Sequence, residues 1–159
     1  MKRHLKIARM WVLVLLLAVA FSAAHAQDTS SIKTALESKE FVFKAETALP
    51  TSGAARHLTG ENYVVRVSGD SLVSYLPYFG RAYVAPVGSE AGIKFTSTRF
   101  DYVVKGRRKG GWDVVLRPKD VSTVRELDLT IGDDGYASLR TLSNDRQPIS
   151  FNGTVQALK

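Results

Sequence analysis

The chain contains no cysteine among its 159 residues. That absence excludes a disulfide-stapled scaffold, thiol catalysis and thiolate metal sites, so apolar packing has to provide the stability. Histidine is nearly as scarce, because only His57 lies beyond residue 26. With one histidine and no cysteine we expect no metal site and no cofactor. No G-x-S-x-G motif accompanies His57, so a Ser-His-Asp hydrolase is not predicted either.

Long hydrophobic runs are also missing. The longest, WVLVLLLAVAF, covers residues 11–21, which is well short of the roughly twenty residues that span a bilayer as a helix. It follows the basic stretch MKRHLKIARM and precedes SAAHA, which is the order of a secretory signal peptide. We therefore expect residues 1–26 to be a signal peptide cleaved between Ala26 and Gln27. A retained membrane anchor is the alternative, and the short run disfavours it.

Export would change the charge of the chain. The sequence has 22 Lys and Arg against 15 Asp and Glu, a net charge of +7. Removal of residues 1–26 takes away four basic residues and no acidic one, which leaves 18 minus 15, or +3. Such a balance argues against a nucleic-acid partner. We expect a soluble protein in the periplasm or outside the cell, without a stable membrane anchor and without a cysteine to carry a lipid.

The pattern of apolar residues predicts a mainly β fold in a single domain. Residues 27–39 form a polar leader and a short amphipathic helix, and residues 40–159 form the β domain. Eight or nine strands separated by turn residues indicate an antiparallel meander that closes into a small barrel or a two-layer sandwich. The predicted core residues are Phe43, Tyr63, Val65, Leu72, Leu76, Tyr102, Trp112, Leu127, Leu129 and Phe151.

A hairpin is predicted around Gly69-Asp70, because glycine accepts the positive φ of a tight hairpin turn. This turn pairs Val67 with Leu72, and it makes both faces of the hairpin substantially apolar. Such a hairpin is either covered on both sides or carries a binding surface. The preceding segment, residues 47–60, has little periodicity and is predicted to be a loop.

Aromatic side chains gather around one arginine in residues 67–86, VSGDSLVSYLPYFGRAYVAP. Pro77 cannot donate to a sheet ladder and Gly80 permits a bend, so the segment between them should leave regular pairing. Aromatic faces beside an arginine can stack on a sugar ring or hold a carboxylate. The same side chains could instead pack over one end of a barrel, and the sequence leaves both alternatives open. The candidate binding residues are Tyr75, Tyr78, Phe79, Arg81 and Tyr83.

Two further clusters have simple structural interpretations. Arg107, Arg108 and Lys109 form a secondary basic patch in GRRKGG, which could touch an anionic surface but is also typical of an exposed hairpin that protects a sheet edge. Asp133-Asp134 lacks the spacing of a calcium loop, and Asp-Gly beside a strand is a common hairpin turn.

Several stretches together resemble a family of domains of unknown function, the one numbered 4251. The similarity lies in VSGDSLVSYLPYFGRAY and GIKF, with FVFKAE, DYVV and RQPISFNG on the flanks, and LPYFGRAY is its distinctive part. The resemblance implies a small exported bacterial β protein. It supplies no catalytic residue, because the family has no assigned activity.

We therefore expect an exported, non-catalytic domain that binds a ligand or protein partner of the cell envelope. The alternative is a hydrolase that acts on envelope polymers through carboxylates, which needs two acids about 5 to 9.5 Å apart in a cleft. Acids that face each other would favour the enzyme, and scattered surface acids would favour the binding domain.

Overall fold

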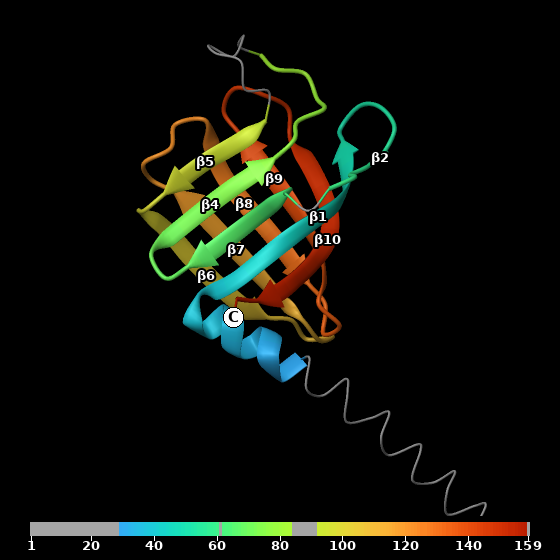
Figure 1. The fold of residues 1–159 in the computed structure, drawn as a ribbon. Coiled ribbons are helices and arrows are strands. Elements are labelled where there is room, and N and C mark those ends of the chain that lie inside the picture. Colours follow the sequence, from blue (N-terminus) through green and yellow to red (C-terminus); the bar gives the residue numbers. More distant parts are fainter. Residues whose placement is uncertain (1–28, 61, 84–91, 159) are drawn as a thin grey trace, which may run out of the picture.

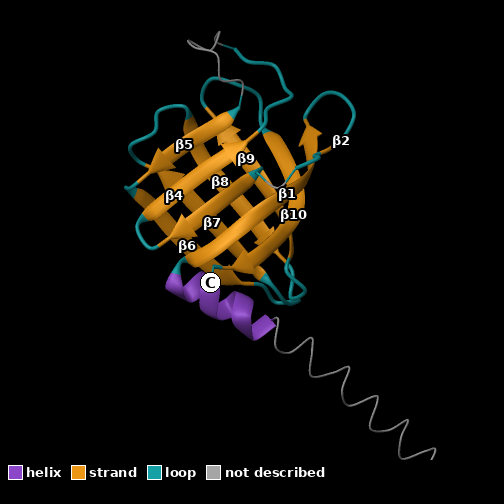
Figure 2. Cartoon of the chain, viewed as in Figure 1, coloured by secondary structure: helices purple, strands orange, loops and turns teal. Residues whose placement is uncertain are grey.

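Alternation of apolar and polar side chains places most of the chain in antiparallel strands (Figures 1 and 2). The structure is a computed structural model that describes residues 29–60, 62–83 and 92–158. The expected signal peptide, residues 1–26, lies outside the described residues. The strands are β1 (Glu40–Pro50), β2 (Arg56–His57), β3 (Val64–Ser68), β4 (Ser71–Leu76), β5 (Ile93–Ser97), β6 (Phe100–Gly106), β7 (Trp112–Pro118), β8 (Val124–Ile131), β9 (Tyr136–Ser143) and β10 (Ile149–Ala157).

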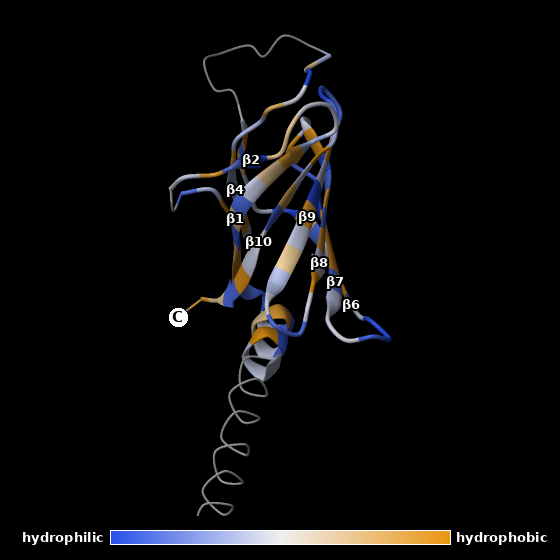
Figure 3. Cartoon of the chain, turned by 90° about the vertical axis from the view of Figure 1, so that its right-hand side faces the viewer, coloured by the Kyte–Doolittle hydropathy of each residue, from blue (hydrophilic) through white to orange (hydrophobic). Residues whose placement is uncertain are grey.

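All ten strands belong to one sheet that closes almost completely into a barrel. Their order is β5-β4-β3-β1-β10-β9-β8-β7-β6, and β2 pairs with β1 beside this path. Figure 3 shows the barrel as two layers, with β1, β2 and β4 in one and β6 to β9 in the other. The predicted fold class, a mainly β meander preceded by one short helix, is confirmed.

The two ends of the sheet path meet at a corner. Residues 98–99 connect β5 to β6, and these two strands do not pair with each other over the described residues. Asp120, which follows β7, holds this corner by accepting hydrogen bonds from the Ser97 hydroxyl and from the Thr98 backbone N–H. A side-chain contact therefore links the layers where the ladder is interrupted.

The β3–β4 hairpin has the predicted register. Val67 pairs with Leu72 and Val65 with Ser74, and Gly69 has a φ of 55°. Tyr63 precedes the first residue of β3 and does not take part in this ladder. Tyr75 points away from the interior, as the alternation predicts, and 42% of its surface is exposed.

The prediction of a loop over residues 47–60 is wrong for residues 47–50 and 56–57, which form strands. β1 continues through Thr47 to Pro50, and Arg56 and His57 form the short β2 on its edge. A β-bulge interrupts the register of β1 between Ala45 and Thr47. Such an extra residue bends the strand and hides the simple alternation on which the sequence analysis relied.

The N-terminal helix, residues 29–38, closes one end of the barrel (Figure 3). Ile32 and Leu36 lie on its buried face, one turn apart. The Tyr102 hydroxyl donates a hydrogen bond of 2.7 Å to the Leu36 carbonyl oxygen, and Lys39 ends the helix with a left-handed φ of 58°. Within the described residues, no helix combines the length and apolar character needed to cross a membrane.

Apolar side chains from both layers fill the interior. Most of the predicted core residues are buried, and Tyr63, Tyr102 and Trp112 are partly buried against them. Three polar residues of the described chain are also buried, namely Ser74, Ser97 and Thr141. The Ser74 and Thr141 hydroxyls donate to the carbonyl oxygens of Ile93 and Ile149, and the Ser97 hydroxyl donates to the Asp120 carboxylate. These bonds satisfy the polar groups that burial removes from water.

Candidate binding site

The segment after β4 leaves regular pairing, as Pro77 and Gly80 predict. It returns to the sheet only at an isolated bridge between Ala82 and Arg146. The Gln147 N–H donates to the Arg81 carbonyl oxygen at 3.0 Å, and the Tyr83 N–H donates to the Asp145 carbonyl oxygen at 2.7 Å. The β4–β5 connection is therefore held to the β9–β10 connection through backbone groups.

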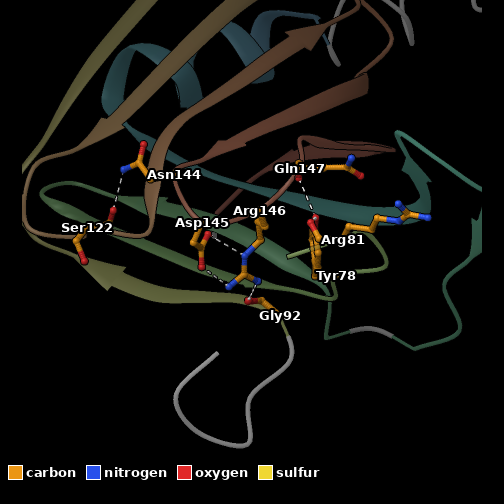
Figure 4. A network of polar contacts seen from close by, with 8 residues as sticks. All are labelled: Tyr78, Arg81, Gly92, Ser122, Asn144, Asp145, Arg146 and Gln147. Atoms are coloured by element: carbon orange, nitrogen blue, oxygen red, sulfur yellow. Dashed lines mark hydrogen bonds and ion pairs between the residues drawn. The ribbon is translucent and has the colours of Figure 1, made fainter. Parts of the chain in front are cut away.

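The Tyr78 side chain packs between the β4–β5 and β9–β10 connections and contacts both. Its hydroxyl lies 2.8 Å from the Arg81 carbonyl oxygen and 3.1 Å from that of Gln147 (Figure 4). The guanidinium carbon of Arg146 lies 4.9 Å from the centre of the Tyr78 ring. Burial raises the pKa of Tyr78, although the positive charge of Arg146 opposes that shift.

Arg146 organises the contacts around Tyr78. It forms a two-pronged ion pair with the neighbouring Asp145, with distances of 3.0 and 2.8 Å, and it also donates to the Gly92 carbonyl oxygen at 2.8 Å. Hydrogen bonds from Arg146 lower the pKa of Asp145. Close by, the Asn144 side-chain amide donates to the Ser122 carbonyl oxygen, so the β7–β8 connection joins the same network (Figure 4).

Tyr75 lies on the outer side of the sheet, in a different environment. The Tyr63 ring stacks on it, with centroids 6.4 Å apart and planes inclined by 17°. The Lys94 ammonium lies 4.5 Å from the centre of the Tyr75 ring. The ladder makes this contact, because it pairs Tyr75 with Val64 on one side and with Lys94 on the other.

The remaining candidates differ in exposure, since one is partly buried and two are exposed. Phe79 is partly buried against the core, and the Arg56 guanidinium lies 4.9 Å from its ring centre. Tyr83 is 66% exposed, and the exposed Arg81 side chain extends away from the Tyr78–Arg146 stack (Figure 4). Tyr78 thus packs at one end of the barrel, whereas Tyr75 and Tyr83 expose their rings.

Three cations that the sequence analysis did not select lie on aromatic rings of this segment. Lys94 comes from β5, Arg56 from β2 and Arg146 from the bridge to the β9–β10 connection. Each ring–cation pair of this kind is worth roughly 0.5–1 kcal/mol at exposed sites. The sequence analysis predicted the aromatic rings of this segment and Arg81. The cations that lie on those rings come from distant segments instead.

The secondary basic patch of Arg107, Arg108 and Lys109 is the exposed tip of the β6–β7 hairpin. This tip lies at the helix end of the barrel, far from the loop that contains Tyr78 (Figure 3). Arg107 Nε lies 3.7 Å from Asp113 Oδ1, so part of the charge is compensated by a neighbouring strand.

The remaining polar candidates have structural partners. His57 is exposed in β2. Asp133 Oδ1 accepts from the Gly111 N–H at 2.8 Å, and Asp134 Oδ1 accepts from the Tyr136 N–H at 3.1 Å, as turn aspartates do. No group of three His, Cys, Asp or Glu side chains in the described part of the chain could hold a metal ion.

Asp128 lies beside a second carboxylate, that of Glu126, on β8. Burial raises the pKa of Asp128, and the neighbouring carboxylate of Glu126 adds to the effect. Glu126 also lies 2.5 Å from Arg117 Nε. Both acids stand side by side on the outer side of β8, whereas a paired-carboxylate hydrolase needs them on opposite walls of a cleft.

Comparisons with known proteins establish the family. A crystal structure of a DUF4251 family protein from Bacteroides eggerthii superposes with a TM-score of 0.64 at 17% identity, over 85% of this chain and 91% of that one, and so shares its fold. No curated protein matches the sequence. Residues 23–155 match the family described as Domain of unknown function (DUF4251), and the chain belongs to that family.

Proposed function

We propose that this protein is an exported, non-catalytic domain that binds a ligand with a flat face and a negative charge. The binding surface is the Tyr75 face, defined as the outer side of strands β3 to β5 with Tyr63, Val64, Arg66, Tyr75 and Lys94. The stack of Tyr63 on Tyr75, with Lys94 over the exposed ring, is the observation that carries the proposal.

The charge of these strands supports an anionic ligand. Strands β3, β4 and β5 contain Arg66 and Lys94 but no Asp or Glu. A uronic-acid polymer has the matching properties, since each sugar offers a C–H face for the ring and a carboxylate for the cation.

Export is part of the proposal. The order of basic stretch, apolar run and small residues up to Ala26 supports cleavage before Gln27. The exported chain would then meet envelope or extracellular polymers directly. Mass spectrometry of protein recovered from the envelope should give a chain that starts at or near Gln27, and an intact Met1 form in the cytosol would contradict export.

The binding test uses polygalacturonate as the acidic probe and dextran as the neutral one. Titration calorimetry at low salt should show binding of polygalacturonate that added salt weakens, whereas dextran should show no salt-dependent binding. Tyr75→Ala should weaken binding about fivefold, whereas Tyr75→Phe should preserve it because the ring remains. Tyr136→Ala is the matched control, since Tyr136 is an exposed tyrosine on another face.

Two results would overturn the proposal. One is an unchanged affinity for polygalacturonate in Tyr75→Ala, or no binding at all at low salt. The other is release of reducing ends from the polymer by the wild-type protein, which would support the hydrolase instead.

A further inference from the structure

A second concave surface lies on the outer side of strands β8, β9, β10 and β1. It is a depression of about 490 Å³, within the range of small-ligand sites. We call it the Tyr136 groove, and the residues used below to define it are Glu46, Arg107, Thr130, Tyr136, Ser138 and Asn152. It shares no lining residue with the Tyr75 face.

The floor of the groove is a row of short polar side chains in register. Thr130 pairs with Ser138, and Ser138 pairs with Asn152 across the next strand. Thr47 continues the row on β1 as the partner of Asn152. Because directly opposed residues share one face of a sheet, hydroxyl and amide groups stand next to each other on four strands.

One wall of the groove is the ring of Tyr136, which is 64% exposed. The backbone of this residue is fixed on both sides, because its N–H donates to Asp134 Oδ1 at 3.1 Å and its carbonyl oxygen accepts from the Gly132 N–H at 2.8 Å. A tyrosine anchored in this way offers a rigid aromatic surface at a low cost in conformational entropy.

Glu46, which the bulge of β1 displaces from the regular ladder, also lines the groove. Bulges commonly change the direction of a side chain in this manner. Arg107 and Asp134 also line the groove, so both signs of charge are present. The two carboxylates outnumber the arginine, which also lies 3.7 Å from Asp113 Oδ1, so the lining disfavours an anion. The hydroxyl groups of a ligand can donate to these carboxylates and accept from the arginine and the amide.

We propose that the Tyr136 groove binds a neutral saccharide, with one sugar face on the Tyr136 ring and its hydroxyl groups on the polar row. The aromatic wall matches the C–H face of a pyranose, and the floor supplies donors and acceptors at the spacing of neighbouring strands. This proposal is independent of the Tyr75 face and of the acidic ligand proposed there.

The test titrates the full protein with three neutral probes, cellohexaose, xylohexaose and mannohexaose, followed by calorimetry and by NMR chemical shifts. At least one probe should bind with millimolar or better affinity and perturb resonances of Tyr136, Ser138 and Asn152. Tyr136→Ala should weaken that binding about tenfold, Asn152→Ala should weaken it severalfold, and Tyr136→Phe should retain it.

Tyr83→Ala, which removes another exposed tyrosine outside the groove, is the matched control and should leave the affinity for the hexasaccharide unchanged. Thermal unfolding of each variant shows whether the fold is intact, and all substituted side chains here are at least partly exposed. The groove proposal is overturned when none of the three probes binds at 10 mM, or when Tyr136→Ala and Asn152→Ala bind as tightly as wild type. Failure of polygalacturonate to bind would affect only the Tyr75 face.

Discussion

The outer side of strands β3–β5 differs from the outer side of strands β6–β8 in the charged side chains that it carries. On β6–β8 and the residue after β7, Lys119 Nζ lies 2.6 Å from Asp101 Oδ2 and Arg117 Nε lies 2.5 Å from Glu126 Oε2. The strands β3–β5 themselves contain no Asp or Glu, and the Lys94 ammonium lies over the ring of Tyr75.

This difference indicates two roles for charged side chains on one barrel. Ion pairs between exposed neighbours contribute little stability, but they compensate each other and leave a well-solvated surface. A cation on an aromatic ring stays positive and lies beside apolar surface, which is the combination that an anionic, flat ligand requires. The two faces therefore differ in composition, because strands β6–β8 carry both signs of charge and strands β3–β5 carry only positive charges.

The largest expected effect concerns the seam between the two layers, where β1 pairs with β10. A Cβ at Gly153 would meet the Lys44 carbonyl oxygen, which belongs to the backbone and cannot move aside cheaply. Gly153→Ala should lower the free energy of unfolding by about 3 kcal/mol, measured by urea denaturation. Gly106→Ala, with open space around the added Cβ, is the control and should be nearly neutral.

The seam variant also tests whether the two faces depend on one fold. Under conditions where Gly153→Ala is substantially unfolded, binding to both the Tyr75 face and the Tyr136 groove should fall together. Full stability in Gly153→Ala would show that β1 and β10 do not approach as closely as the structure places them.

The next effect compares Arg146, which is held in a network of polar contacts, with the exposed Arg81. Arg146→Ala removes the ion pair with Asp145, the bond to Gly92 and the stack on Tyr78, so we expect a loss of about 2 kcal/mol. Arg81→Ala removes an exposed side chain and should cost about 0.5 kcal/mol. Equal losses in thermal or urea unfolding would contradict the different roles assigned to the two arginines.

Substitution of two exposed arginines, one on each face, tests the difference between the faces directly. Arg117→Ala breaks a surface ion pair and should change stability by about 0.5 kcal/mol, with no effect on polygalacturonate binding. Arg66→Ala should change stability by a similarly small amount. It should weaken polygalacturonate binding about twofold, because it removes a charge from the Tyr75 face. Equal affinities of the two variants in calorimetry would remove the distinction between the faces.

The smallest effect is confined to acid and concerns the corner between the layers. Hydrogen bonds from Ser97 and Thr98 hold the pKa of Asp120 at about 2, below its ordinary 3.8. A carboxyl group with a depressed folded pKa contributes stability above pH 3.8 and loses that contribution as the pH falls to about 2. The stability difference between wild type and Asp120→Asn should therefore shrink over this interval, and a constant difference would argue against the corner contact.

Much of the candidate site could be predicted from residues close together in sequence. Alternation assigned Tyr75 to the outer side of β4, Gly69-Asp70 set the hairpin register, and Pro77 marked where pairing ends. These properties follow from local rules, namely a side-chain period of two, the freedom of glycine at positive φ and the missing N–H of proline.

The sequence by itself thus determined the β class, the short helix, the inward positions of most core residues and the outward position of Tyr75, but it assigned Tyr63 to the core and missed its stacking on Tyr75. Only the tertiary structure decided which cations lie on those rings, because Lys94, Arg56 and Arg146 come from separate strands and loops. It also decided the polar row of the Tyr136 groove, which depends on the registers of β8, β9 and β10. Cross-strand register and barrel closure are set by the packing of the whole core, and no short stretch of sequence carries that information.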